Sequence, residues 1–161
     1  RQVLDVVQVG PAFHPRYDAR SRSYRYTIYN WPIRSPLFRR SSLHIPVKLD
    51  VAGMQAAAQL LVGEHDFATF GQPPQGESTV RRVMRAEWSG EPPWVVLDIE
   101  ANAFLQRMVR SLVGTMIDVG IGRMSVDGFA AAFAARDRAL AGPTAPPHGL
   151  CLVEVKYEGY Y

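Results

Sequence analysis

Several residue types and sequence patterns are rare or missing in the chain, and each absence excludes a class of protein. It contains one cysteine, Cys151, so no disulfide can form within it, which suits the reducing cytoplasm. No apolar run approaches the roughly 20 residues that a membrane-spanning helix needs, and no signal-peptide pattern opens the chain. We therefore expect a cytoplasmic protein with no membrane segment.

Metal-binding and phosphate-loop patterns are also missing. The histidines are scattered without the spacing of metal ligands, so no metal site is expected. The glycine pair Gly120 and Gly122 follows a predicted helix, whereas a phosphate-binding glycine loop follows a strand. Neither a metal nor a nucleotide cofactor is therefore expected.

Lysine is scarce, and arginine supplies almost all of the positive charge. Sixteen of the eighteen cations are arginine, although a GC-rich genome would also favour that residue. Between residues 13 and 40, seven arginines stand against a single acid, Asp18, and four tyrosines and Trp31 lie among them. Such a local excess of arginine, interleaved with aromatic rings, is typical of an RNA-binding surface.

The composition and the hydrophobic pattern predict one folded α+β domain over residues 1–161. Hydrophobic residues make up 47% of the chain and charged residues 20%, as in folded globular proteins. Strand and helix patterns alternate in a way that favours a mainly antiparallel sheet covered by helices on one side. We expect strands at 23–30, 43–47, 79–88, 94–101 and 150–157, and helices at 50–62, at 104–119 and from 125 onward.

The strand at 23–30 carries candidate RNA-contacting side chains on both faces. Alternation places Arg22, Tyr24, Tyr26 and Ile28 on one face, and Arg25, Thr27 and Tyr29 on the other. Tyrosine offers a ring for stacking on a base and a hydroxyl for proton transfer. The alternative is that both Tyr24 and Tyr26 are packing residues of the sheet.

Two arginines, Arg107 and Arg110, lie on the predicted helix at 104–119. Helical spacing puts them about 60° apart, opposite the apolar stripe. A solvated helix face would explain them. However, the helix macrodipole disfavours cations near the N-terminus, so a carboxylate or phosphate partner explains them better.

Two pairs of residues, each containing at least one acid, are weaker candidates for a catalytic site. Asp98 and Glu100 share a strand face roughly 7 Å apart, which suits either an inverting glycosidase pair or two solvated acids. His65 and Asp66 are adjacent in sequence, and adjacent side chains seldom face one substrate. We therefore do not expect them to form a catalytic pair.

Five segments, taken together and in order, resemble the tRNA pseudouridine synthase A family. They cover nearly the whole chain with similar spacing. The segments are FHPRYDARSRSYRYTIYN (13–30), LLVGEHDFATF (60–70), STVRRV (78–83), ANAFLQRMVRSLVGTMIDVGIG (101–122) and RDRALAGPTAPPHGLCLVEVKY (136–157).

The resemblance implies one half of the pseudouridine synthase fold and the isomerisation of uridine to pseudouridine in the anticodon arm of tRNA, at positions 38–40 in the family. It also implies a homodimer that needs no cofactor and no metal. The target base must leave its stack, so an aromatic residue receives it and basic residues hold phosphates. By resemblance, the catalytic residues are Tyr24, beside the flipped base, and Arg110, beside a catalytic aspartate. The expected RNA-binding residues are Arg16, Arg20, Arg22, Arg25 and Arg107.

One departure from the family is decisive. The Arg-Thr-Asp-Ala-Gly-Val-His type of motif that carries the catalytic aspartate occurs nowhere in the chain. We therefore expect a C-terminal domain that supplies half of the cleft and is inactive alone. A tRNA-binding module without catalysis and a dimerisation domain are the alternatives.

Overall fold

The sheet at the centre of the computed structural model has six strands, and the structure describes residues 19–73, 76 and 78–157. The order is β2-β1-β5-β4-β3, and β6 also pairs with β1. Only the pairing of β1 with β2 is parallel, which confirms the mainly antiparallel α+β prediction. The strands are β1 (Ala19–Asn30), β2 (Leu43–Ile45), β3 (Gly63–Asp66), β4 (Val80–Glu91), β5 (Trp94–Ala101) and β6 (Leu150–Tyr157).

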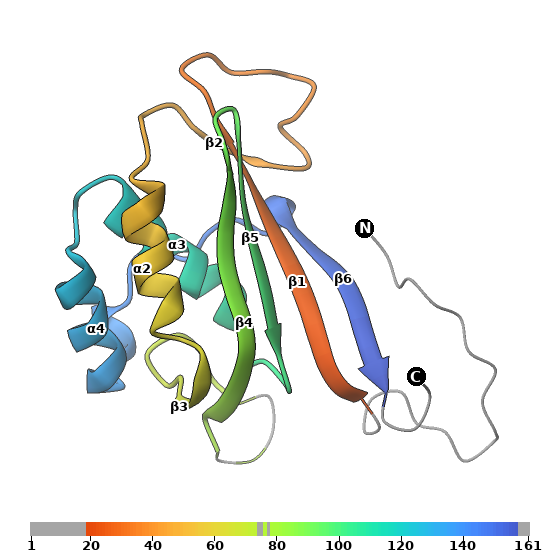
Figure 1. Cartoon of the computed structure of the whole chain (residues 1–161), viewed down its shortest axis with the longest axis vertical. Coiled ribbons are helices and arrows are strands. Elements are labelled where there is room, and N and C mark those ends of the chain that lie inside the picture. The colour runs from red at the N-terminus through yellow and green to blue at the C-terminus, as the bar shows by residue number, and fades with distance from the viewer. Residues whose placement is uncertain (1–18, 74–75, 77, 158–161) are drawn as a thin grey trace.

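The helices lie on one face of this sheet (Figure 1). They are α2 (Val51–Gln59), α3 (Met108–Gly120) and α4 (Val126–Ala135), and two short 3-10 turns follow, η1 (Arg138–Leu140) and η2 (Pro147–Gly149). The side chains of β5 that face the helices are fully buried, as its alternation predicts; they are Val95, Leu97, Ile99 and Ala101. No described helix is long and apolar enough to cross a membrane.

Two helices begin at the residues that local sequence indicates. The Asp50 side chain accepts a hydrogen bond from the Gly53 N–H at 3.0 Å, and the Ser125 hydroxyl accepts one from the Gly128 N–H at 2.9 Å. Both are N-caps, which satisfy amide groups that a helix leaves without partners. These contacts are local, so the sequence predicted them correctly.

The predicted start of the helix at residue 104 was wrong. The α3 helix begins at Met108, because Gln106 forms an isolated bridge with Gln72 and its N–H donates to the Gln72 carbonyl at 2.8 Å. Arg107 then precedes the helix in the left-handed conformation, with φ 65°. Arg107 and Arg110 therefore do not share a helix face, and the 60° relation between them does not hold.

The loop between η1 and η2 packs directly against α3. The Gly142 N–H donates to the Thr115 hydroxyl at 2.9 Å, and that hydroxyl donates to the Ser111 carbonyl at 2.7 Å. At Gly114, an added Cβ atom would lie 1.6 Å from the Pro143 carbonyl oxygen. The absence of a side chain at Gly114 thus lets the loop approach the helix.

Candidate functional site

Tyr24 and Arg110, the two expected catalytic residues, line the same small hollow. The hollow lies where β1 and the start of β6 meet the N-terminal end of α3, and its other walls include Phe104, Arg107 and Leu150. Its volume is about 160 Å³. Pockets for drug-sized ligands measure roughly 300–1,000 Å³. The hollow therefore suits a group no larger than a single base.

The position of Tyr24 is fixed by a strand and by an aromatic neighbour. On β1 it pairs with Ile99 on one side and Leu152 on the other. Its ring meets the Phe104 ring edge to face, with centroids 5.1 Å apart and planes at 84°. Within the described residues no hydrogen bond engages the half-buried phenol of Tyr24, so that group can interact with a ligand.

Tyr26, which lies on the same face of β1 as Tyr24, is a packing residue. It is fully buried, and its hydroxyl donates to the Pro146 carbonyl at 2.6 Å. Burial raises the pKa of Tyr26 to about 12, although the charge of Arg110 opposes the shift. The phenol therefore stays neutral at physiological pH. It tethers the loop before β6.

One N–H group of the Arg110 guanidinium is hydrogen-bonded within the chain, and the others are available to a ligand. Its Nε donates to the Ala145 carbonyl at 2.8 Å, and its own carbonyl accepts from the Ala145 N–H at 3.0 Å. A guanidinium has five N–H donors, so four remain for a carboxylate or a phosphate. No acid lies among the residues that line the hollow. A partner for these donors must come from outside the described lining.

The expected RNA-binding arginines separate into three groups. Arg16 lies outside the described residues. Arg20 and Arg107 are exposed, Arg22 is half-buried, and none of these three forms an ion pair with the described part of the chain. Arg25 lies on the opposite strand face from Tyr24 and pairs with Asp98 at 2.8 Å, so a phosphate would compete with this carboxylate.

Asp98 and Glu100, considered above as a glycosidase pair, have separate structural partners. Asp98 accepts from Arg25, and the hydrogen bond raises the pKa of that guanidinium. Glu100 accepts from the Ser21 hydroxyl at 2.8 Å and pairs with Lys156 at 3.3 Å. Burial acts to raise the pKa of Glu100, but these partners outweigh it and hold that pKa below its ordinary value. Both acids are therefore cross-strand partners in this structure.

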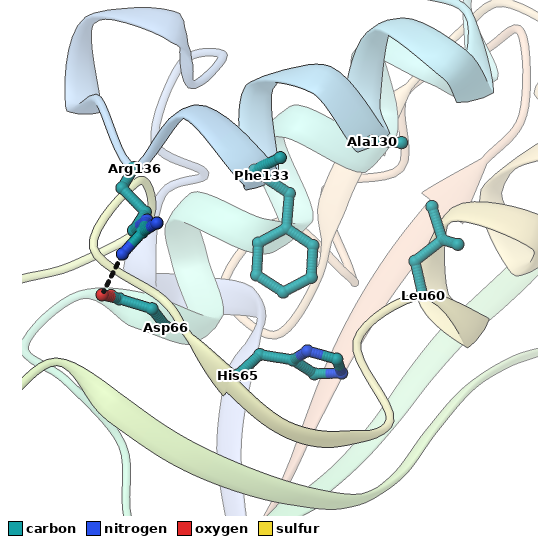
Figure 2. A pocket seen from close by; sticks show the side chains of 7 residues that line it. Leu60, His65, Asp66, Ala130, Phe133 and Arg136 are labelled. Carbon is teal, nitrogen blue, oxygen red and sulfur yellow. Dashed lines mark ion pairs between the residues drawn. The ribbon is translucent and has the colours of Figure 1, made fainter.

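His65 and Asp66 lie beside a larger, open hollow of about 470 Å³, but their side chains diverge (Figure 2). The His65 ring meets the Phe133 ring at a centroid distance of 5.4 Å. Asp66 turns toward Arg136 at 3.7 Å and accepts from the Thr79 hydroxyl at 2.6 Å. The prediction that these neighbours form no catalytic pair agrees with this geometry. Among the described residues, no cluster of His, Cys, Asp and Glu could hold a metal ion.

Asp66 should make stability depend on pH in the acid range. The hydrogen bond from Thr79, assisted by Arg136, lowers the pKa of Asp66. The stabilisation is therefore complete above the unfolded-state pKa of about 3.9 and disappears as the pH falls through the lower folded-state value. We expect Asp66→Asn to lower the Tm at pH 7 and to approach the wild type below about pH 4. Thermal unfolding from pH 7 to pH 2 measures this, with exposed Glu64→Gln as control, and an unchanged gap at low pH would contradict it.

Sequence reasoning missed two walls of the small hollow. Phe104 was assigned to the stripe of a helix that begins four residues later. Leu150 was recognised only as the start of a strand, and nothing local indicates that it lines the same hollow as Tyr24. Its place depends on the pairing of β6 with β1, in which Leu150 lies opposite Tyr26.

Comparisons with known proteins agree with the motif analysis. A family model described as tRNA pseudouridine synthase matches residues 57–158. Among curated proteins, the tRNA pseudouridine synthase A of Geotalea uraniireducens (strain Rf4) is 46% identical over 156 residues, which cover 96% of this chain and 64% of that protein. That of Neisseria gonorrhoeae (strain ATCC 700825 / FA 1090) is 44% identical over 160 residues, 99% of this chain and 60% of that protein. That of Roseiflexus sp. (strain RS-1) is 49% identical over 160 residues, 96% and 58% respectively.

The matches cover most of this chain but only part of each relative. The chain spans about 60% of the length of these curated relatives. The family model, in turn, covers more than half of the chain and includes α3, with Arg110, and the whole of β6. The chain belongs to the tRNA pseudouridine synthase family.

Proposed function

We propose that this chain is the C-terminal domain of a tRNA pseudouridine synthase that converts uridine to pseudouridine in the anticodon arm. The observation that carries the proposal is the meeting of Tyr24 and Arg110 in one base-sized hollow. Family membership and the arginine-rich stretch before residue 41 support tRNA as the substrate. The resemblance adds a cytoplasmic homodimer as the working form, with no cofactor.

The reaction needs no cofactor because it rearranges one nucleoside. The C1′–N1 bond of uridine breaks, the base turns, and a C1′–C5 bond forms. The proton on C5 leaves and N1 gains one, so the composition is unchanged. The enzyme must extract the base from its stack, hold it while it is detached, and accept the C5 proton.

The residues of the hollow fit two of these tasks, holding the base and moving the proton, and they add two supporting roles. The Tyr24 ring, braced by Phe104, offers a face to the extruded base, and its phenol can relay a proton. Leu150 supplies an apolar wall that limits water. The free donors of Arg110 hold the carboxylate of the catalytic aspartate, which in this proposal comes from a segment outside the 161 residues.

This assignment makes the chain one half of a cleft. Residues 1–161 alone then bind tRNA without turnover, because the aspartate that starts the reaction is not among them. The exposed Arg20 and Arg107 and the half-buried Arg22 contribute positive charge for the phosphates. The second candidate, a tRNA-binding module without catalysis, shares these contacts but assigns no chemical role to Tyr24.

Tyr24→Phe in the complete gene product separates these two functions. It keeps the ring against Phe104 and removes only the hydroxyl, so tRNA affinity should change by less than about 3-fold, while loss of a general acid or base lowers kcat by about 100-fold or more. Single-turnover pseudouridine formation and equilibrium tRNA binding measure the two effects.

The control for this experiment is Thr27→Val, which removes a hydroxyl from the opposite face of the same strand without changing side-chain shape. It should leave both constants unchanged. Equal losses of kcat and affinity in Tyr24→Phe would make the tyrosine a structural residue. A complete gene product that binds tRNA and forms no pseudouridine would establish the second candidate.

A further inference from the structure

A cationic hollow of about 520 Å³ lies at the C-terminal end of β1, beside Tyr29. It is formed by the segment between β1 and β2, by both of those strands and by η2, and no carboxylate lines it. We call it the Arg34–Arg39 pocket. The residues that line it are Tyr29, Arg34, Ser35, Pro36, Phe38, Arg39, Ser42, His44 and His148.

The aromatic wall of this pocket is well supported. The Tyr29 ring packs against Phe38 at a centroid distance of 5.3 Å and against His44 at 5.7 Å. Trp94 packs behind both Tyr29 and Phe38, at 5.1 and 4.8 Å. The Ser42 hydroxyl donates to the Phe38 carbonyl at 2.7 Å and so tightens the loop that carries the arginines.

The cations of the pocket are not neutralised within the described structure. Arg34 and Arg39 are exposed, and neither forms an ion pair with any described residue. The Nε2 of His44 is engaged with the Trp31 carbonyl at 2.7 Å, which fixes the ring on the pocket wall. Arg25, by contrast, already has a carboxylate partner in Asp98 and lies outside this pocket.

This combination fits a nucleotide. Two unpaired guanidinium groups bind phosphate oxygens through paired N–H donors. Aromatic rings beside them accept a base or a ribose by stacking, without reading sequence. The volume is within the range of sites that enclose a ligand of nucleotide size, and the small hollow at Tyr24 is not.

We propose that the Arg34–Arg39 pocket binds a second nucleotide of the same tRNA, with its phosphate on Arg34 and Arg39 and its base or ribose against Tyr29 and Phe38. The inference rests on the proposed function, since it assumes an RNA substrate. It adds a site that anchors the RNA away from the chemistry.

The fold connects this pocket to the small hollow. Tyr24 and Tyr29 are five residues apart on β1, which corresponds to about 17 Å along the strand. His148 lines the pocket and Leu150 lines the hollow, so the end of η2 lies between them. Because alternation places Tyr24 and Tyr29 on opposite faces of β1, an RNA that occupies both sites must pass around the edge or the end of this strand.

The test is Arg34→Ala with Arg39→Ala in the complete gene product, measured as tRNA affinity against salt concentration. We expect at least about 10-fold weaker binding near physiological salt, and a slope of log K against log salt that is shallower by about 0.9 for each phosphate that the variant no longer neutralises. The kcat at saturating tRNA should not change. The control, Arg123→Ala with Arg138→Ala, removes the same charge from exposed positions outside both hollows and should bind almost as the wild type does.

A charge-conserving variant addresses folding and the role of charge. Arg34→Lys with Arg39→Lys keeps the salt slope and restores most of the affinity if phosphate is the ligand, because lysine still attracts it as a point charge. The inference is overturned if the alanine pair matches the Arg123 and Arg138 control in affinity and slope. It is also overturned if the alanine pair loses only binding of uridine 5′-monophosphate, because the pocket would then serve a free nucleotide.

These outcomes are distinct from failure of the proposed function. Wild-type protein that forms no pseudouridine would refute the synthase activity, whatever the pocket does. Weaker RNA binding by the alanine pair in such a protein would still support the pocket. Conversely, the alanine pair could bind tRNA as the wild type does while Tyr24→Phe loses pseudouridine formation. That result would refute RNA binding by the pocket and would still support the proposed synthase activity.

Discussion

Arg110→Ala should lower pseudouridine formation by the complete gene product by at least about 100-fold, the size of effect seen when one preorganised charged or hydrogen-bonding group leaves an active site. In the proposed function, the free donors of Arg110 hold the catalytic aspartate in its ionised form. Removing the cation raises the pKa of that aspartate. The acid limb of the pH profile of kcat should therefore move to higher pH, which single-turnover rates between pH 5 and pH 9 would measure.

Arg110→Lys is the matched variant for this experiment. Lysine keeps the charge but loses the planar fork and the Nε–H that donates to Ala145. We expect a smaller shift of the acid limb than with alanine, together with a reduced rate. A rate for Arg110→Ala within about 3-fold of the wild type, with an unmoved pH profile, would contradict the role of Arg110 in catalysis.

Gly114→Ala should destabilise this domain strongly, by about 3 kcal/mol in the free energy of unfolding, the upper end of the usual cost of an added group in a packed interior. The new Cβ would lie 1.6 Å from the Pro143 carbonyl oxygen, so the helix and the loop cannot both keep their places. Because the same loop carries the Ala145 carbonyl that holds Arg110, catalysis should fall with stability. Urea unfolding of the purified protein measures the first effect.

The same substitution elsewhere provides the control. At Gly128 in α4, an added Cβ would meet only side-chain atoms, Ser125 Oγ at 3.2 Å and Met124 Cγ at 3.3 Å. Alanine also favours helix over glycine by about 1 kcal/mol, so Gly128→Ala should change stability little. Similar losses of unfolding free energy in Gly114→Ala and Gly128→Ala would contradict the prediction, because they would show that the loop between η1 and η2 moves aside at little cost.

Local patterns predicted much of the fold, because their physical causes are local. The caps at Asp50 and Ser125 are hydrogen bonds across three residues, and the buried face of β5 follows from simple alternation. The start of α3 was misjudged because the apolar pair at 104–105 continues the helical pattern. A long-range bridge between Gln72 and Gln106 diverts the backbone there, and no window of sequence around residue 104 contains it.

The candidate site was predictable only in part. Motif similarity identified Tyr24 and Arg110, and the structure brings them to one hollow. The carbonyl of Ala145 and the side chain of Leu150 required the tertiary structure, because a loop and a strand distant in sequence carry them. Arg34 and Arg39 were counted in the basic stretch, yet only the fold shows that they share a pocket with His148.

The left-handed backbone at Arg107 has a consequence for how this position can evolve. A non-glycine residue in that conformation costs about 1–2 kcal/mol, and glycine would remove most of the cost. The arginine is therefore opposed by backbone stability and favoured by the charge that it places beside the hollow. If the proposed function holds, stability and RNA binding favour different residues at position 107, with glycine giving the more stable domain and arginine the stronger binding.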